Sequence, residues 1–200
     1  MLDKYLNELF FPTLNTICIK LRHFGIRANW ITFLGLVFAF LLLLALSFGY
    51  FYLCIFFVLM NRICDGLDGC LARLEGPSNF GGFIDIVFDF VFYSFVPLGF
   101  AIYAESNYFA CVVLLTAFYI NGGTFLGFAS IASKNCKSID FGKKSIYYSD
   151  GLIEGTETVI FFLLFCLFPD YFSLIAYIFA GLTLITAGNR IRLAADLFNN

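Results

Sequence analysis

Four aspartates stand at helical spacings within one short segment of a strongly apolar chain. Asp65 and Asp68 are three residues apart, and Asp85 and Asp89 are four residues apart. Residues at these spacings share one face of a helix, so each pair presents two carboxylates in one direction. A charge at the centre of a membrane helix costs roughly 2.5–3.5 kcal/mol on insertion scales. The spacing therefore predicts two facing helices that hold a compensating cation between them.

The chemistry expected of such a cluster is metal-assisted phosphoryl transfer. Hard divalent ions such as Mg²⁺ and Mn²⁺ prefer oxygen ligands, and two ions roughly 3.5–4 Å apart can hold both oxygens of an in-line displacement. Arg73 offers a planar donor fork for phosphate. Small residues leave room for it at Gly66, Gly69, Ala72, Gly81 and Gly82. The alternative is structural, with the carboxylates paired to Arg62 and Arg73, but two arginines cannot neutralise four aspartates.

This segment resembles the signature of the CDP-alcohol phosphatidyltransferase family, D-x2-D-G-x2-A-R followed, after about eight residues, by G-x3-D-x3-D. Eight residues fill the fixed positions: Asp65, Asp68, Gly69, Ala72, Arg73, Gly81, Asp85 and Asp89. Seven residues, Leu74 to Phe80, separate Arg73 from Gly81, so the connecting turn is one residue shorter than in the family pattern. The resemblance is specific for these 25 residues.

The resemblance implies a reaction in which an alcohol hydroxyl attacks the β-phosphorus of a CDP-alcohol, commonly CDP-diacylglycerol, and CMP leaves. Asp65 and Asp85 would bridge two Mg²⁺ or Mn²⁺ ions, and Asp68 would ligate the first. Asp89 would ligate the second ion and accept the proton of the acceptor hydroxyl. Donor contacts are implied at Gly69, Arg73 and Ser78.

A second family element is an asparagine and a threonine ahead of the first membrane helix, which Asn29 and Thr32 match without the proline of the family pattern. The resemblance implies a nucleotide contact there. The alternative for Asn29 is a helix N-cap.

Composition places the chain in a membrane. Hydrophobic residues make up 61% of it and the mean hydropathy is +0.89, which excludes an ordinary soluble domain. Apolar runs near the roughly 20 residues needed to cross a bilayer recur along the chain. The predicted spans are 30–48, 51–74, 80–103, 108–133, 152–168 and 171–193. We therefore expect an all-α membrane protein with one domain over residues 1–200, in which residues 29–200 form a six-span bundle.

Residues 1–28 are expected to form an interfacial amphipathic segment ahead of the bundle. Apolar residues recur there at helical spacing, and Pro12 is expected to break the helix. The apolar positions are Leu2, Leu6, Leu9, Phe10, Leu14, Ile17 and Leu21. The alternative is a partner-binding helix.

All twelve basic residues map to one side of the predicted spans. The opposite loops, near Gly49, Glu105 and Asp170, contain no Lys or Arg. Positive-inside logic then places both termini and the aspartates in the cytoplasm, with the chain in a bacterial-type inner membrane.

The acceptor site is less defined by the sequence. Glu154 and Glu157 share a helix face at the start of the fifth span and are candidates to receive acceptor hydroxyls, although acidic residues there also suit the helix dipole. An acceptor phosphate would need a cation other than Arg73. The candidates are Lys134, Arg190 and Arg192. Glycerol phosphate, inositol phosphate, serine and another lipid all remain open as acceptors.

The leading hypothesis is a phospholipid-synthesis enzyme, with transfer from a soluble CDP-alcohol to diacylglycerol as the alternative reaction. A divalent-metal carrier would explain the carboxylates but not Gly69, Ala72 and Arg73, and a catalytically dead scaffold should have lost aspartates. The expected partners are CDP-diacylglycerol, a hydroxyl-bearing acceptor, membrane lipid and a second copy of the chain, with no nucleic acid. Gly123 and Gly127 would permit close helix packing, within one protomer or across a homodimer.

Overall fold

The computed structural model describes residues 14–135 and 155–198, and the regular structure within these ranges is helical. The longer helices are α2 (Ala28–Ser47), α3 (Phe51–Glu75), α4 (Asn79–Tyr103), α5 (Tyr108–Asn135), α7 (Gly155–Leu167) and α8 (Phe172–Phe198). One-turn 3-10 helices, η1 (Glu105–Asn107) and η2 (Pro169–Tyr171), precede α5 and α8. Residues 14–23 form a further helix, and residues 24–27 are a non-helical connection to α2. Residues 1–13 of the predicted interfacial segment lie outside the described residues.

Each predicted span coincides with a helix to within a few residues, so the all-α prediction is confirmed. Four helical segments within the described ranges are long and apolar enough to cross a membrane: Ala28–Ser47, Asn79–Tyr103, Glu105–Ser133 and Pro169–Phe198. The first half of the charged signature, Asp65 to Arg73, lies on α3, and α7 has 13 residues. The six-span arrangement therefore stays a prediction.

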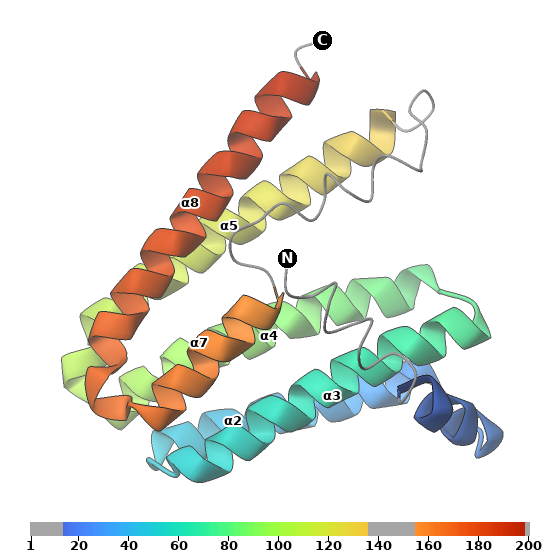
Figure 1. The fold of residues 1–200 in the computed structure, drawn as a ribbon, viewed down its shortest axis with the longest axis horizontal. Coiled ribbons are helices and arrows are strands. Elements are labelled where there is room, and N and C mark those ends of the chain that lie inside the picture. Colours follow the sequence, from blue (N-terminus) through green and yellow to red (C-terminus); the bar gives the residue numbers. More distant parts are fainter. Residues whose placement is uncertain (1–13, 136–154, 199–200) are drawn as a thin grey trace.

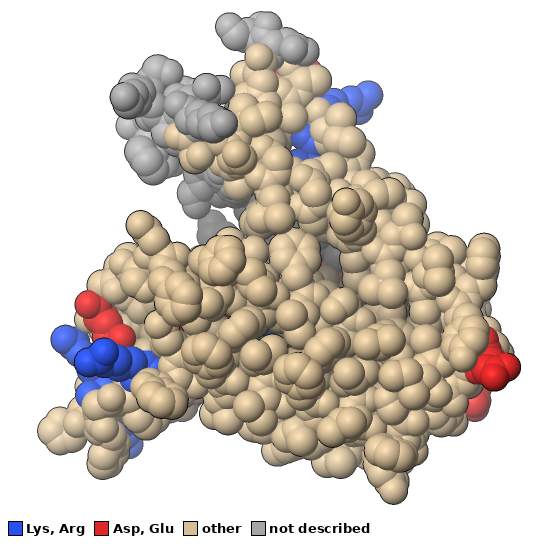
Figure 2. Space-filling model, turned by 180° about the vertical axis from the view of Figure 1, so that it is seen from behind, with Lys and Arg blue, Asp and Glu red and all other residues tan. Residues whose placement is uncertain are grey.

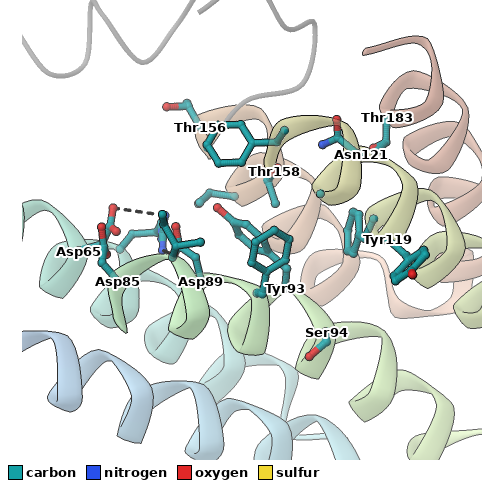
Figure 3. A pocket seen from close by; sticks show the side chains of 18 of the residues that line it. Asp65, Asp85, Asp89, Tyr93, Ser94, Tyr119, Asn121, Thr156, Thr158 and Thr183 are labelled. Carbon is teal, nitrogen blue, oxygen red and sulfur yellow. Dashed lines mark hydrogen bonds and ion pairs between the residues drawn. The ribbon is translucent and has the colours of Figure 1, made fainter. Parts of the chain in front are cut away.

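The helices form two groups that diverge from each other (Figure 1). Helix α2 packs against both α3 and α4, while α5 packs along α8. Helix α7 contacts α3 and α8, and α4 contacts α5, so these contacts join the two groups. The aspartates lie on α3 and α4, where the group formed by α2, α3 and α4 faces the α5–α8 pair (Figures 1 and 3).

An aromatic core fixes the end of the molecule at which η1 and η2 lie. The rings of Phe100 and Phe172 stack with centroids 4.1 Å apart, and those of Phe161 and Phe179 stack at 4.3 Å. On α4, a Cβ added to Gly99 would lie 2.6 Å from the Cβ of Leu46, so the close crossing with α2 requires glycine. This end is therefore tightly packed.

The three loops that lack basic residues meet at this packed end. A side chain at Gly49 would begin 2.8 Å from the Tyr103 ring at the end of α4. The Asn107 amide donates to the Phe100 carbonyl at 3.2 Å and accepts from the Ser173 hydroxyl at 3.3 Å. On the face shown in Figure 2, basic side chains lie away from this end, where the coloured side chains are acidic. The charge asymmetry used to predict orientation is therefore present in the fold.

Close packing of α5 occurs one residue away from the predicted position. A Cβ added to Gly122 would lie 2.5 Å from the Phe90 ring of α4, so this glycine permits the α4–α5 contact. A Cβ added to Gly123 or Gly127 meets nothing within 4 Å in the described structure. The prediction of close packing at these two glycines within one protomer is therefore wrong, because the helix turns Gly122 toward α4 instead.

Candidate functional site

Three of the four aspartates form a compact cluster between α3 and α4, which both pack against α2. Asp65, Asp68 and Asp85 each offer a carboxylate oxygen, and these oxygens all lie within 4.8 Å of one another. Asp68 is buried, whereas Asp65 and Asp85 are half-buried. Like charges at this separation repel in a partly dry environment. Three oxygens in this arrangement fit a hard divalent cation such as Mg²⁺ or Mn²⁺.

Asp89 is not part of this cluster and forms an ion pair with an arginine of α3. The Arg62 Nη2 atom lies 2.6 Å from Asp89 Oδ1, and Arg62 Nη1 lies 3.3 Å from Asp65 Oδ2. Figure 3 shows Asp65, Asp85 and Asp89 projecting toward one another from the two helices. The four carboxylates therefore do not form two equal pairs. Three are grouped together, and the fourth is paired with Arg62.

Arg62 is held by hydrogen bonds, ion pairs and aromatic rings around its guanidinium. Its Nε and Nη2 atoms donate to Asn61 Oδ1 at 3.3 and 3.2 Å, and Asn61 donates to the Gly35 carbonyl of α2 at 3.0 Å. The guanidinium carbon lies 5.2 Å from the centroid of the Phe92 ring and 6.0 Å from that of Tyr93. In the sequence, Arg62 was a candidate only as one of two structural counter-ions. Its position beside Asn61 in an apolar helix was the available signal.

Two cavities flank the aspartates. A small cavity of about 580 Å³ lies among α2, α3 and α4, and a large cavity of about 1750 Å³ lies among α3, α4, α5, α7 and α8. Asp68 lines the small cavity, whereas Asp65 and Asp89 line the large one. Of the described carboxylates, Asp85 alone lines both. A group bound in the small cavity and a group bound in the large cavity would therefore both reach the aspartates.

The small cavity brings together four of the five residues predicted to contact the donor: Asn29, Thr32, Gly69 and Ser78. Any side chain at Gly81 would begin 2.9 Å from Ser78 Oγ and 3.1 Å from Asn29 Oδ1, so the glycine is needed for this approach. Ser78 is also the N-cap of α4, because its Oγ accepts from the Gly81 N–H at 2.9 Å.

The N-cap alternative for Asn29 is wrong. The N-cap position of α2 is Arg27, which makes no side-chain capping bond, and Asn29 lies inside the helix. Its amide therefore faces the small cavity from the first turn of α2.

Arg73, the fifth predicted donor contact, is exposed in the last turn of α3 and does not line either cavity. Its Nη1 atom lies 3.5 Å from the point at which a Gly69 side chain would begin, so the guanidinium lies next to a residue that lines the small cavity. Two arginines that the sequence did not single out, Arg22 and Arg27, line the small cavity instead. Their place just ahead of the first span was the only sequence signal for them.

The large cavity is mainly apolar, with aromatic walls from α4 and α5 that include Phe90, Tyr93, Phe118, Tyr119 and Phe125. Its polar lining beyond the aspartates is mostly neutral. Thr156, Thr158, Thr183 and Asn121 project toward it from α7, α8 and α5 (Figure 3).

The structure brings only part of the predicted acceptor group to this cavity. Arg190 lies in its wall, where Nη1 donates to the Asn121 carbonyl at 3.1 Å, to Asn121 Oδ1 at 2.9 Å and to the Thr124 hydroxyl at 3.0 Å. Arg192 is exposed and does not line it, because it lies two residues further along α8. Glu157 is half-buried in the first turn of α7, outside the lining.

Two acceptor predictions have no side-chain description. Lys134 lies near the end of α5, but the position of its side chain is outside the described part of the structure. Glu154 lies outside the described residues altogether.

The family model for CDP-alcohol phosphatidyltransferase matches residues 25–187. The chain is 41% identical over 195 residues to the "Inner membrane protein YnjF" of Escherichia coli (strain K12), a match that covers 96% of this chain and 94% of that protein.

Among solved structures, the fold is similar to that of the Mycobacterium tuberculosis phosphatidylinositol phosphate synthase (PgsA1) determined with CDP-DAG bound. The TM-score is 0.73 at 18% identity, covering 91% of this chain and 93% of that one. At this identity the likeness establishes the fold alone.

Proposed function

Because the chain belongs to the CDP-alcohol phosphatidyltransferase family, we propose that it transfers a phosphatidyl group from CDP-diacylglycerol to an alcohol acceptor and releases CMP. The observation that carries this proposal is the position of Asp85 between the two cavities. A nucleotide in the small cavity and a hydroxyl in the large one would meet at the aspartates. The neighbour solved with CDP-DAG bound and the relative named an inner membrane protein support the choice of donor and of membrane.

The nucleotide end of the donor is assigned to the small cavity. Asn29, Thr32, Gly69 and Ser78 supply an amide, two hydroxyls and a bare backbone surface, which suit a cytidine and a diphosphate. Arg22 and Arg27 add positive charge to the lining, and Arg73 stands beside Gly69. The diacylglycerol end is assigned to the large cavity, because its aromatic and aliphatic walls suit acyl chains.

The cluster of Asp65, Asp68 and Asp85 is proposed to hold a divalent cation, Mg²⁺ or Mn²⁺, which would neutralise charge on the phosphoryl oxygens when bound. Asp89 is proposed to accept the proton of the acceptor hydroxyl, since it lines the large cavity beside the cluster. The two-ion arrangement implied by the family resemblance would also need Asp89 as a metal ligand. That carboxylate is engaged by Arg62.

Arg190 is the proposed anchor for an acceptor phosphate, because it is the predicted cation whose described side chain lies in the wall of the large cavity. We expect Arg190→Ala to raise KM for a phosphate-bearing acceptor by roughly 10-fold or more, with donor KM within about 2-fold. Arg192→Ala is the matched control, since this exposed arginine lies outside the lining. Steady-state kinetics with each substrate varied in turn measure the difference. Unchanged acceptor KM in both variants would favour Lys134 or an uncharged acceptor.

The membrane arrangement proposed with this activity has six spans and a cytoplasmic active site. Two observations support this arrangement. Each of the six predicted segments matches a helix, and the loops near Gly49, Glu105 and Asp170 contain no basic residues. A homodimer is also proposed. The glycine spacing in the sequence and the open space beside Gly127 of α5 support it.

The direct test is a transfer assay with the purified protein in phospholipid nanodiscs. CDP-diacylglycerol is supplied with glycerol phosphate, inositol phosphate or serine in separate reactions, and CMP is quantified by chromatography. We expect CMP release to depend on Mg²⁺ or Mn²⁺ and on one class of acceptor, and to stop in EDTA. Full CMP release in EDTA would contradict the metal-assisted reaction.

A further inference from the structure

We propose that the Arg62 guanidinium is a built-in cation that takes the place of a second divalent ion, so that each chain binds one such ion, at Asp65, Asp68 and Asp85. The inference rests on the proposed function only in taking these aspartates as the metal site. It concerns how the positive charge of the site is divided between the protein and the metal. It also changes what Asp89 does, from a metal ligand to a carboxylate held by the protein.

The position of Arg62 carries the first step. Its Nη1 and Nη2 atoms reach Asp65 Oδ2 at 3.3 Å and Asp89 Oδ1 at 2.6 Å, so one planar group spans a carboxylate of α3 and a carboxylate of α4. A second ion at this site would use the same two carboxylates. Asp89 is also absent from the group of oxygens that lie within 4.8 Å of one another. The described geometry thus provides one three-carboxylate cluster and one carboxylate pair already bridged by a cation.

The second step is that this bridge is built into the fold. Asn61 accepts from two nitrogens of Arg62 and is itself tied to the Gly35 carbonyl of α2. Phe92 and Tyr93 of α4 lie against the guanidinium, an arrangement that stabilises a cation. The Arg62 side chain is only 17% exposed. Three helices therefore fix the guanidinium between the carboxylates, unlike a surface arginine that turns away when another cation arrives.

The third step is electrostatic. A guanidinium stays protonated in proteins, so Arg62 is a permanent charge, and its planar fork suits two carboxylates at once. A divalent ion bound by the same pair would lie within a few ångströms of it and would be repelled. Arg62 uses Oδ1 of Asp89 and orients this carboxylate toward the large cavity, where the acceptor hydroxyl is proposed to bind. The arginine would thus supply the orientation that a second ion would otherwise give.

The test counts bound ions. The full-length protein in nanodiscs is titrated with Mn²⁺, and free Mn²⁺ is measured from its six-line EPR signal. We expect one bound Mn²⁺ per chain for the wild type, and also when CDP-diacylglycerol is present without acceptor. Arg62→Met keeps the length of the side chain and removes its charge, so it should bind two, with broadening of the EPR signal from coupling between close ions. Arg190→Met, the same change at the arginine in the large-cavity wall, should still bind one.

Two Mn²⁺ ions per wild-type chain, with or without donor, would overturn the inference, as would one ion in a folded Arg62→Met variant. The wild-type count decides the matter even where Arg62→Met does not fold. CMP release is measured on the same wild-type sample, which separates the two proposals. A wild type that binds two ions and releases CMP would keep the proposed function and lose this inference.

Discussion

Asp85→Asn is expected to abolish divalent-cation binding and to lower CMP release by about 10³-fold or more. Both effects are expected because Asp85 belongs to the three-carboxylate cluster and lines both cavities. Asparagine keeps the size of the side chain but removes the negative charge that the ion requires, so the change tests charge rather than packing. Both effects are measured on one preparation, by Mn²⁺ titration and by CMP release from CDP-diacylglycerol.

The matched control for Asp85→Asn is Asp170→Asn, the same substitution in η2 at the packed end of the molecule. This variant should bind Mn²⁺ and turn over like the wild type. If Asp85→Asn keeps both properties while its thermal unfolding matches that of the control, the assignment of the metal cluster is wrong.

Asp89→Asn is expected to lower turnover by about 10²–10⁴-fold while the protein still binds its divalent cation. Asp89 lies outside the three-carboxylate cluster and is held by Arg62, so removing its charge takes away the proton acceptor and leaves the metal ligands in place. An asparagine oxygen can still accept from Arg62, which keeps the local packing. Mn²⁺ binding and single-turnover CMP release separate the two effects.

The comparison that matters is between the Asp89 and Asp85 variants. Loss of Mn²⁺ binding in Asp89→Asn to the same degree as in Asp85→Asn would make Asp89 a metal ligand and would remove the separate role given to it. Wild-type turnover in Asp89→Asn would remove it from proton transfer.

The features that sequence analysis predicted well are those that depend on local spacing. The helices follow from runs of apolar residues, and the pairing of Asp65 with Asp68 and of Asp85 with Asp89 follows from helical periodicity. The short turn between α3 and α4 then brings these pairs together, and α2 brings Asn29 and Thr32 to the same cavity as Ser78.

The features that were missed or left undecided depend on the packing of distant helices. The Arg62 bridge requires Asn61 to reach Gly35 of α2, a contact across 26 positions, and Arg190 is set by Asn121 of α5, 69 positions away. Nothing in the local pattern distinguishes Arg190 from Arg192. The choice of Gly122 over Gly123 at the α4–α5 contact likewise depends on how α5 is rotated, which the glycine spacing alone does not fix.

The most direct test of the central claim follows the β-phosphorus itself. CDP-diacylglycerol labelled with ³²P in its β-phosphate is given to the wild-type protein in nanodiscs with Mg²⁺ and the acceptor panel, and the lipid and aqueous phases are separated. The account predicts that label moves into a new phospholipid in step with the release of unlabelled CMP, and that Asp85→Asn shows neither. Label that stays in CDP-diacylglycerol with every acceptor, or equal transfer by wild type and Asp85→Asn, would contradict it.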